Sequence, residues 1–160
     1  RGIYEVPIEK SFDVVICGVG FPKDTNLYQT SRAASYLFFV SNPVIKKGGC
    51  IIIPAACQEG AGKGVGEQRF LEMLKNRTID EILTQEEFRS GEQRAFLMAN
   101  VLKHCKVIIV GSRMPEVVKD AKMMAAKDME EAFSIVKNDL GNDMEVLVVR
   151  NALITLPVIQ

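Results

Sequence analysis

The residues best suited to do chemistry in this sequence form one short run. The side-chain amide of Gln29 and the guanidinium of Arg32 stand three positions apart, so a helix that starts near Asn26 carries both on one face. That face lies at the helix N-terminus, where the helix dipole favours a negative charge. The spacing therefore favours an anion-binding site at the start of this helix.

Each residue of the run also has a purely structural interpretation, and the sequence alone leaves these interpretations open. Asp24 or Asn26 is suited to cap the helix, because a short polar side chain can accept a hydrogen bond from the first free backbone N–H groups. Tyr28 is a candidate for the hydrophobic core. Arg32 is equally a candidate for an ion pair on the helix surface, and Lys23 for a solvated position.

A strand, a loop and a helix must position this run. Apolar residues at 13–18 predict a buried strand, two glycines follow at Gly18 and Gly20, and a helix is expected from Asn26 towards Val40. In a parallel α/β sheet, ligands bind at the carboxyl ends of the strands, because the loops and helix N-termini there present unpaired N–H groups. We expect the loop that contains Gly20 and Pro22 to form the floor of any site.

The rest of the chain alternates between strand-like and helix-like segments. We expect strands at 50–54, 107–110 and 145–149, an edge strand at 4–8, a short helical turn at 44–47, and helices at 67–76, after Thr78, from Ser90, at 115–124 and at 128–140. Strands that alternate with helices of this length need crossover connections. The sequence therefore predicts an α/β fold over residues 1–160, a three-layer sandwich whose mostly parallel, Rossmann-like sheet has helices on both faces.

Two strand-to-helix loops are rich in glycine, which raises the question of nucleotide binding. A Walker A motif in the loop at 55–66 would need glycine in place of Cys57 and serine or threonine in place of Gly64. A dinucleotide fingerprint fails at its third glycine in both loops, at Lys23 and at Val65. The glycines still leave N–H groups free to meet a small anion such as a carboxylate.

Composition narrows the class of protein. The 160 residues suit one domain, and 20 basic residues balance 20 acidic ones, which argues against a nucleic-acid partner without excluding a local patch. The sequence has no apolar run of the length needed to cross a membrane, so no membrane partner is expected. The four cysteines form no CxxC pair and are expected to be buried free thiols, which favours a cytoplasmic protein.

The run Gly20 Phe21 Pro22 Lys23 Asp24 Thr25 Asn26 Leu27 Tyr28 Gln29, followed by Arg32, resembles the C-terminal domain of the nickel-dependent lactate racemase family. The strand before it, the later Gly48 Gly49 with its apolar strand, and the loop with Glu59 and Gly60 are also similar. The resemblance covers most of the chain.

The resemblance implies a substrate-binding role for Tyr28, Gln29 and Arg32, with Gln29 hydrogen-bonding a 2-hydroxy acid and Arg32 neutralising its carboxylate. It assigns loop-shaping or capping roles to a second set of residues, namely Gly20, Pro22, Asp24, Asn26, Glu59 and Gly60. Arg32 stands where the family has lysine, and this chain has no tryptophan where the family has one near the start of the helix from Ser90; Glu92 or Gln93 stands there. A planar, bidentate guanidinium is not equivalent to a compact ammonium. These departures favour a larger or more polar 2-hydroxy acid than lactate.

The resemblance also implies a nickel pincer nucleotide cofactor, a pyridinium thioamide/thiocarboxylate mononucleotide, in a cleft between two domains. The family's cofactor-bearing lysine and its nickel-binding and proton-moving histidines belong to an N-terminal domain, whereas this chain contains only His104, which we interpret as structural. Because the sequence starts at Arg1 without an initiator methionine, we expect it to be the C-terminal domain of a longer two-domain protein, and to be catalytically silent alone. The alternative is a stand-alone Rossmann-like module that binds an anion or a nucleotide without catalysis.

Overall fold

Five parallel strands form the centre of the fold. The computed structural model describes residues 4–160. The main sheet contains β2 (Phe12–Cys17), β3 (Ile45–Pro54), β4 (Lys106–Val110), β5 (Met124–Ala126) and β6 (Val146–Val149), in the spatial order β5-β4-β3-β2-β6. Every neighbouring pair in this sheet is parallel. The carboxyl ends of all five strands therefore meet at one edge.

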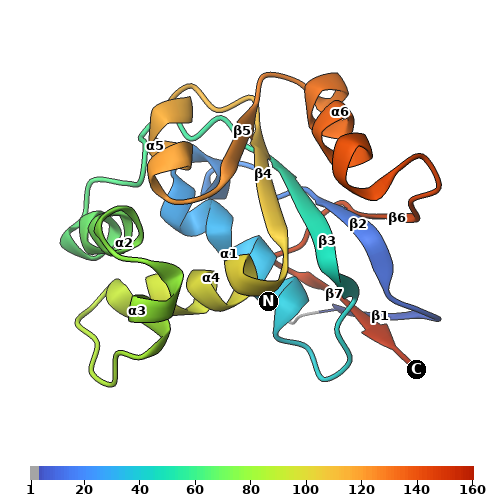
Figure 1. The fold of residues 1–160 in the computed structure, drawn as a ribbon, viewed down its shortest axis with the longest axis horizontal. Coiled ribbons are helices and arrows are strands. Elements are labelled where there is room, and N and C mark those ends of the chain that lie inside the picture. The colour runs from blue at the N-terminus through green and yellow to red at the C-terminus, as the bar shows by residue number, and fades with distance from the viewer. Residues whose placement is uncertain (1–3) are drawn as a thin grey trace.

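Helices cover both faces of this sheet, as Figure 1 shows. One face packs against α1 (Leu27–Phe38) and α4 (Glu92–His104), with α2 (Val65–Asn76) and α3 (Ile79–Leu83) lying against α4. The other face packs against α6 (Met129–Leu140), and α5 (Pro115–Asp120) connects β4 to β5. The predicted three-layer α/β fold is confirmed.

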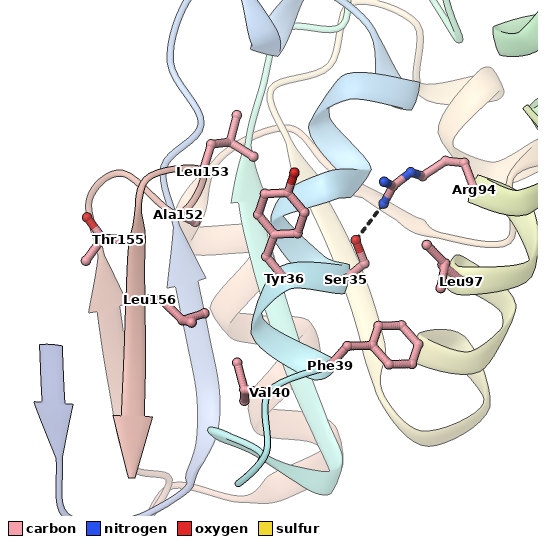
Figure 2. Close-up of a pocket in the computed structure, with 10 residues that line it drawn as sticks. All are labelled: Ser35, Tyr36, Phe39, Val40, Arg94, Leu97, Ala152, Leu153, Thr155 and Leu156. Atoms are coloured by element: carbon pink, nitrogen blue, oxygen red, sulfur yellow. Dashed lines mark hydrogen bonds between the residues drawn. The ribbon is translucent and has the colours of Figure 1, made fainter. Parts of the chain in front are cut away.

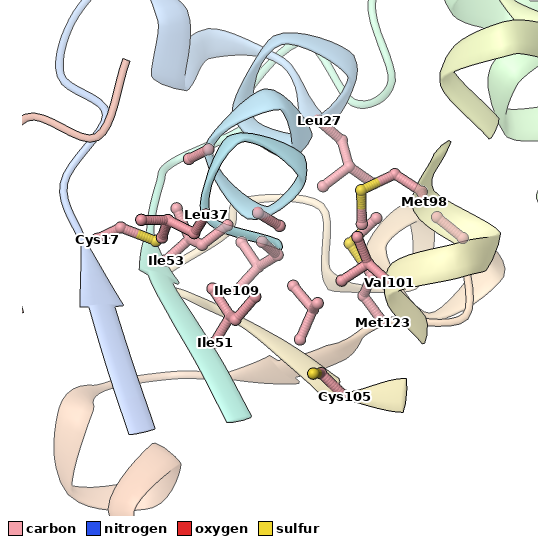
Figure 3. Close-up of a cluster of buried hydrophobic side chains, with 14 of the residues drawn as sticks. Cys17, Leu27, Leu37, Ile51, Ile53, Met98, Val101, Cys105, Ile109 and Met123 are labelled. Carbon is pink, nitrogen blue, oxygen red and sulfur yellow. The ribbon is translucent and has the colours of Figure 1, made fainter. Parts of the chain in front are cut away.

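The central strands are β-branched because both of their faces are buried. Val15, Ile51 and Ile53 point into the larger core beneath α1 and α4, part of which is drawn in Figure 3. Val14 and Ile52 point the opposite way, into the smaller core beneath α6. This alternation follows from the two-residue period of a strand, and it holds the two layers of helices to one sheet.

The N-terminal and C-terminal segments pair with each other. β1 (Tyr4–Ile8) and β7 (Thr155–Ile159) form a separate two-stranded parallel sheet. The edge strand expected at 4–8 therefore exists, but its partner is the last strand of the chain and not the main sheet. β7 itself was not predicted.

Two further segments differ from the expectation. The helical turn expected at 44–47 is wrong, because residues 45–47 begin β3, where Ile45 pairs with Phe12 and is buried. The helix expected at 115–124 ends at Asp120; Lys122 then adopts a left-handed φ of 62°, and the chain enters the short strand β5. A non-glycine residue at positive φ cannot continue a right-handed helix, which explains the early stop.

All four cysteines are free and buried, as expected. Burial raises the pKa of the Cys50 thiol to about 12 and of the Cys57 thiol to about 11. These thiols are therefore protonated at neutral pH and behave as small apolar side chains. Within residues 4–160, no helix has the length and apolar character needed to cross a membrane.

Candidate functional site

Two loops at the carboxyl edge of the sheet are tied together by backbone hydrogen bonds. The loop after β2 accepts two hydrogen bonds from the loop after β3. The Cys57 N–H donates to the Asp24 carbonyl at 2.9 Å, and the Glu59 N–H donates to the Thr25 carbonyl at 2.9 Å. In return, the Leu27 N–H donates to the Gly60 carbonyl at 2.8 Å. The first turn of α1 is thus fixed from both sides, and side chains at this turn have a defined position.

Local backbone geometry explains which residues shape these loops. Gly20 has φ +76° and Gly60 has φ +62°, conformations that glycine adopts without a steric cost. Between them, Pro22 follows a cis peptide bond and precedes the 3-10 turn η1 (Lys23–Thr25), in which the Asp24 N–H donates to the Gly20 carbonyl at 3.1 Å. Glu59 contributes its backbone to the loop contact, while its side chain lies 4.0 Å from Lys63.

Asn26 is the residue that caps α1. Its side-chain oxygen accepts a hydrogen bond from the Gln29 N–H at 2.9 Å, and the residue is 7% exposed. Asp24, the other candidate, lies inside η1 and does not cap the helix. The cap is therefore contributed by the loop that also orients Gln29.

Tyr28, Gln29 and Arg32 lie on the first turns of α1, and all three are half-buried. The Tyr28 ring packs edge-on against Phe70, with ring centroids 5.5 Å apart. The guanidinium carbon of Arg32 lies 5.9 Å from the centroid of the Tyr28 ring, within range of a cation–π contact. One side of Tyr28 therefore packs against the core, and the other side contacts Arg32.

The polar atoms of this region lack partners to an unusual degree. Over residues 4–160, the buried side-chain nitrogen and oxygen atoms without any hydrogen bond are Asp24 Oδ1, Gln29 Oε1, Arg32 Nε and Arg94 Nε. Buried polar atoms in folded proteins are almost always paired, and exceptions need an explanation. All four belong to α1, to the turn before it or to the helix packed against it, which marks this region as the place where a polar ligand would bind.

Arg94 is the residue that the sequence analysis missed. It lies near the start of α4 and donates from its guanidinium to the Ser35 hydroxyl at 2.6 Å, as Figure 2 shows. Burial, and next the charge of Arg32, lower the pKa of Arg94. The available signal was its spacing: Arg94 precedes Leu97 by three positions and Met98 by four, which places a cation beside the apolar stripe of α4.

The residues expected to replace the family's tryptophan do not reach this region. Glu92 is 5% exposed, and its carboxylate accepts hydrogen bonds from the Arg89 backbone and side chain. Gln93 is exposed. Arg94, one position further, is the member of this segment that approaches α1.

Two cavities run beside α1 and meet at Tyr36 and Leu153. One, of about 370 Å³, is lined by Arg32 and by residues of the loop after β2 and of the turn after β6. The other, of about 300 Å³, lies between α1, α4 and the segment that leads into β7 (Figure 2). Its wall is mainly apolar, and Arg94, Ser35 and Tyr36 supply its polar groups.

The described residues offer hydrogen-bond donors and cations but no metal-binding cluster. Within residues 4–160, no group of three or more His, Cys, Asp or Glu side chains could hold a metal ion. His104 ends α4, its Nδ1–H donates to the Asn100 carbonyl at 2.9 Å, and its ring packs near Phe38. These contacts give His104 a structural place at the end of α4, away from the residues that line the two cavities.

Comparison with known proteins finds relatives that match this chain over most of its length. Residues 8–156 match the family described as the lactate racemase C-terminal domain. A lactate racemase from Thermoanaerobacterium thermosaccharolyticum is 34% identical over 146 residues, which cover 88% of this chain and 33% of that protein. The chain therefore spans about a third of the length of the curated relative that it matches.

Solved structures agree with this assignment. The lactate racemase apoprotein from the same organism superposes with a TM-score of 0.77 at 30% identity, over 94% of this chain and 36% of that one. A protein from Thermotoga maritima superposes with a TM-score of 0.61 at 14% identity, over 98% of this chain and 39% of that one, which shows a shared fold alone. The predicted family resemblance is confirmed: this chain belongs to the lactate racemase C-terminal domain family.

Proposed function

We propose that this chain is the substrate-side domain of a 2-hydroxy acid racemase or epimerase that works with a nickel pincer nucleotide. The observation that carries the proposal is the set of unpaired buried polar atoms around the first turns of α1, in a member of the lactate racemase C-terminal domain family. In this proposal the chain is the C-terminal domain of a longer two-domain protein, and its N-terminal domain is its partner.

The roles of the three substrate-binding residues follow from their chemistry. Arg32 neutralises the substrate carboxylate, and its contact with the Tyr28 ring limits the directions in which the guanidinium can point. Gln29 follows the cap residue Asn26 and has an unpaired amide oxygen, which suits it to accept a hydrogen bond from the substrate hydroxyl. Together these contacts hold the carboxylate and the hydroxyl of the substrate, and so orient its Cα towards the opposite side of the cleft.

The side chains of this chain fit the substrate side of such a site and not the nickel ion. Its unpaired groups bind an anion, whereas its described residues bring together no set of metal ligands. We therefore propose that the N-terminal domain holds the cofactor, a pyridinium thioamide/thiocarboxylate mononucleotide. When bound, that group supplies the acceptor for the hydride of the substrate Cα.

The test is made on the full-length protein, produced in cells that synthesise the cofactor. We expect bound nickel and interconversion of the two configurations of at least one acid in a panel of 2-hydroxy acids. Arg32→Gln should lower kcat/KM about 10- to 100-fold, because a hydrogen bond to a charged group contributes about 1.5–3 kcal/mol. Its nickel content should be unchanged, and the 160-residue chain alone should show no turnover.

The matched control is Arg69→Gln, which removes the same charge from α2, outside the two cavities beside α1. It should leave kcat/KM unchanged. A full-length protein without nickel and without turnover would refute the proposal. That result would favour the alternative hypothesis, a stand-alone anion- or nucleotide-binding module without catalysis.

A further inference from the structure

Two arginines from different helices lie beside each other at this site. Arg32 belongs to α1 and Arg94 to α4. The Ser35 hydroxyl accepts from the Arg94 guanidinium at 2.6 Å and donates to the backbone carbonyl of Arg32 at 3.0 Å, so the Arg94 guanidinium meets α1 one turn after Arg32. The charge of Arg32 is, after burial, the largest cause that lowers the pKa of Arg94. Their proximity is therefore a feature of the packing of α1 on α4.

Nothing negative compensates these two charges. Over residues 4–160, neither Arg32 nor Arg94 forms an ion pair, although other basic residues do, such as Arg89 with Glu92 and Lys75 with Asp120. Each guanidinium also has a buried Nε–H without an acceptor. Two neighbouring, partly desolvated cations with unpaired donors are unfavourable unless an anion neutralises them.

The two cations line two adjoining cavities. Arg32 lines the cavity beside the loop after β2, Arg94 lines the cavity beside β7, and Tyr36 and Leu153 line both. In Figure 2 the Tyr36 side chain points towards Leu153, the Arg94 guanidinium lies on the side of α1 that faces α4, and Ser35 lies between them. A single carboxylate can be bound fully by Arg32, so the donors of Arg94 remain for a second acidic group.

We infer that Arg32 and Arg94 form a two-point anion site, and that the substrate is a 2-hydroxy acid with a second carboxylate. The carboxylate next to the hydroxyl binds Arg32, and the distal carboxylate binds Arg94. Arg94 is then the residue that determines specificity for a dicarboxylate. The assignment of a 2-hydroxy acid rests on the proposed function, whereas the two-point binding of a dicarboxylate does not.

The inference is tested by binding, on the full-length protein produced without its cofactor. Calorimetric titrations at low ionic strength use three probes: 2-hydroxysuccinate, succinate and lactate. We expect both dicarboxylates to bind about 10- to 100-fold more tightly than lactate, since a second charge-assisted contact separates them. Arg94→Gln should remove this difference and leave lactate binding unchanged, while Arg69→Gln should leave all three affinities unchanged.

Arg94→Lys is the variant that controls for folding, because it keeps the charge and loses only the guanidinium geometry. It should retain part of the preference for dicarboxylates. Equal affinities for lactate and the dicarboxylates, a preference that survives Arg94→Gln, or no binding of any probe would overturn the inference. A dicarboxylate preference in a protein that binds no nickel would support the two-point site and refute the racemase, whereas a nickel-dependent racemase without this preference would do the reverse.

Discussion

Replacing Gly91 with alanine tests how the start of α4, and with it Arg94, is held in place. Gly91 precedes α4 with φ +91°, and at this point the chain touches the first turn of α2. A Cβ added to Gly91 would overlap the Gly66 carbonyl group and would lie 2.6 Å from the Gly66 Cα. Both neighbours are backbone, so neither can move aside by a change of rotamer.

The expected loss of stability has two parts. A side chain at this left-handed φ costs about 1–2 kcal/mol. Separating the two backbones adds an overpacking cost of about 1–3 kcal/mol or more. Together Gly91→Ala should lower the free energy of unfolding by about 2–5 kcal/mol, out of a total of about 5–15 kcal/mol for an ordinary domain. For a chain of this size, the midpoint of thermal unfolding should fall by about 10 °C.

Urea denaturation followed by circular dichroism measures this loss, and Gly111→Ala is the matched control. Gly111 also has a positive φ, +78°, but an added Cβ there meets no atom within 4 Å. Gly111→Ala should therefore lose only the conformational part, about 1–2 kcal/mol. Equal losses in the two variants would refute the argument that backbone contact between α2 and α4 requires glycine at position 91.

Two further variants test contacts near the site. Asn26→Ala removes the cap of α1 and should lower the free energy of unfolding by about 1 kcal/mol, whereas Asn26→Asp should preserve the cap and the stability. Urea denaturation measures both variants, and no loss for Asn26→Ala would contradict the capping role. Glu92→Gln tests a pH dependence: hydrogen bonds from the Arg89 side chain and backbone lower the pKa of Glu92 below its ordinary value of 4.5. The stabilisation is therefore complete above pH 4.5 and is lost as the pH falls through the lowered pKa, so the stability difference between Glu92→Gln and the wild type should shrink on acidification and should not grow.

The elements that sequence predicts correctly are those whose signal is local. The β-branched runs at 50–54 and 107–110 are buried on both faces, and this burial excludes polar residues from every position. β5 was not predicted because its sequence, Met124 Ala125 Ala126, contains no β-branched residue. This strand also pairs with β4 alone. β7 escaped because it pairs with β1, about 150 positions earlier in the sequence, and no local pattern encodes such a partner.

The candidate site likewise has one part that the sequence predicts and one part that it does not. Gln29 and Arg32 can be predicted because they lie three residues apart on one helix whose start is marked by Asn26. Arg94 cannot be placed beside them without knowing that α4 packs against α1, which is a tertiary fact. The charge beside the apolar stripe of α4 indicates only that Arg94 lies near a buried surface, and not which surface.

The net charge of the whole chain gives no indication of the positive charge at this site. Twenty basic and twenty acidic residues give a formal net charge of zero, and many basic residues on the surface are paired with acidic neighbours. Arg32 and Arg94 are not paired, so the local charge between α1 and α4 is positive although the mean is zero. A ligand responds to the local potential, which a partly buried cavity strengthens because water is excluded from it. This local charge is why we propose an anion as the ligand, and the distance between the two cations then decides whether that anion carries one acidic group or two.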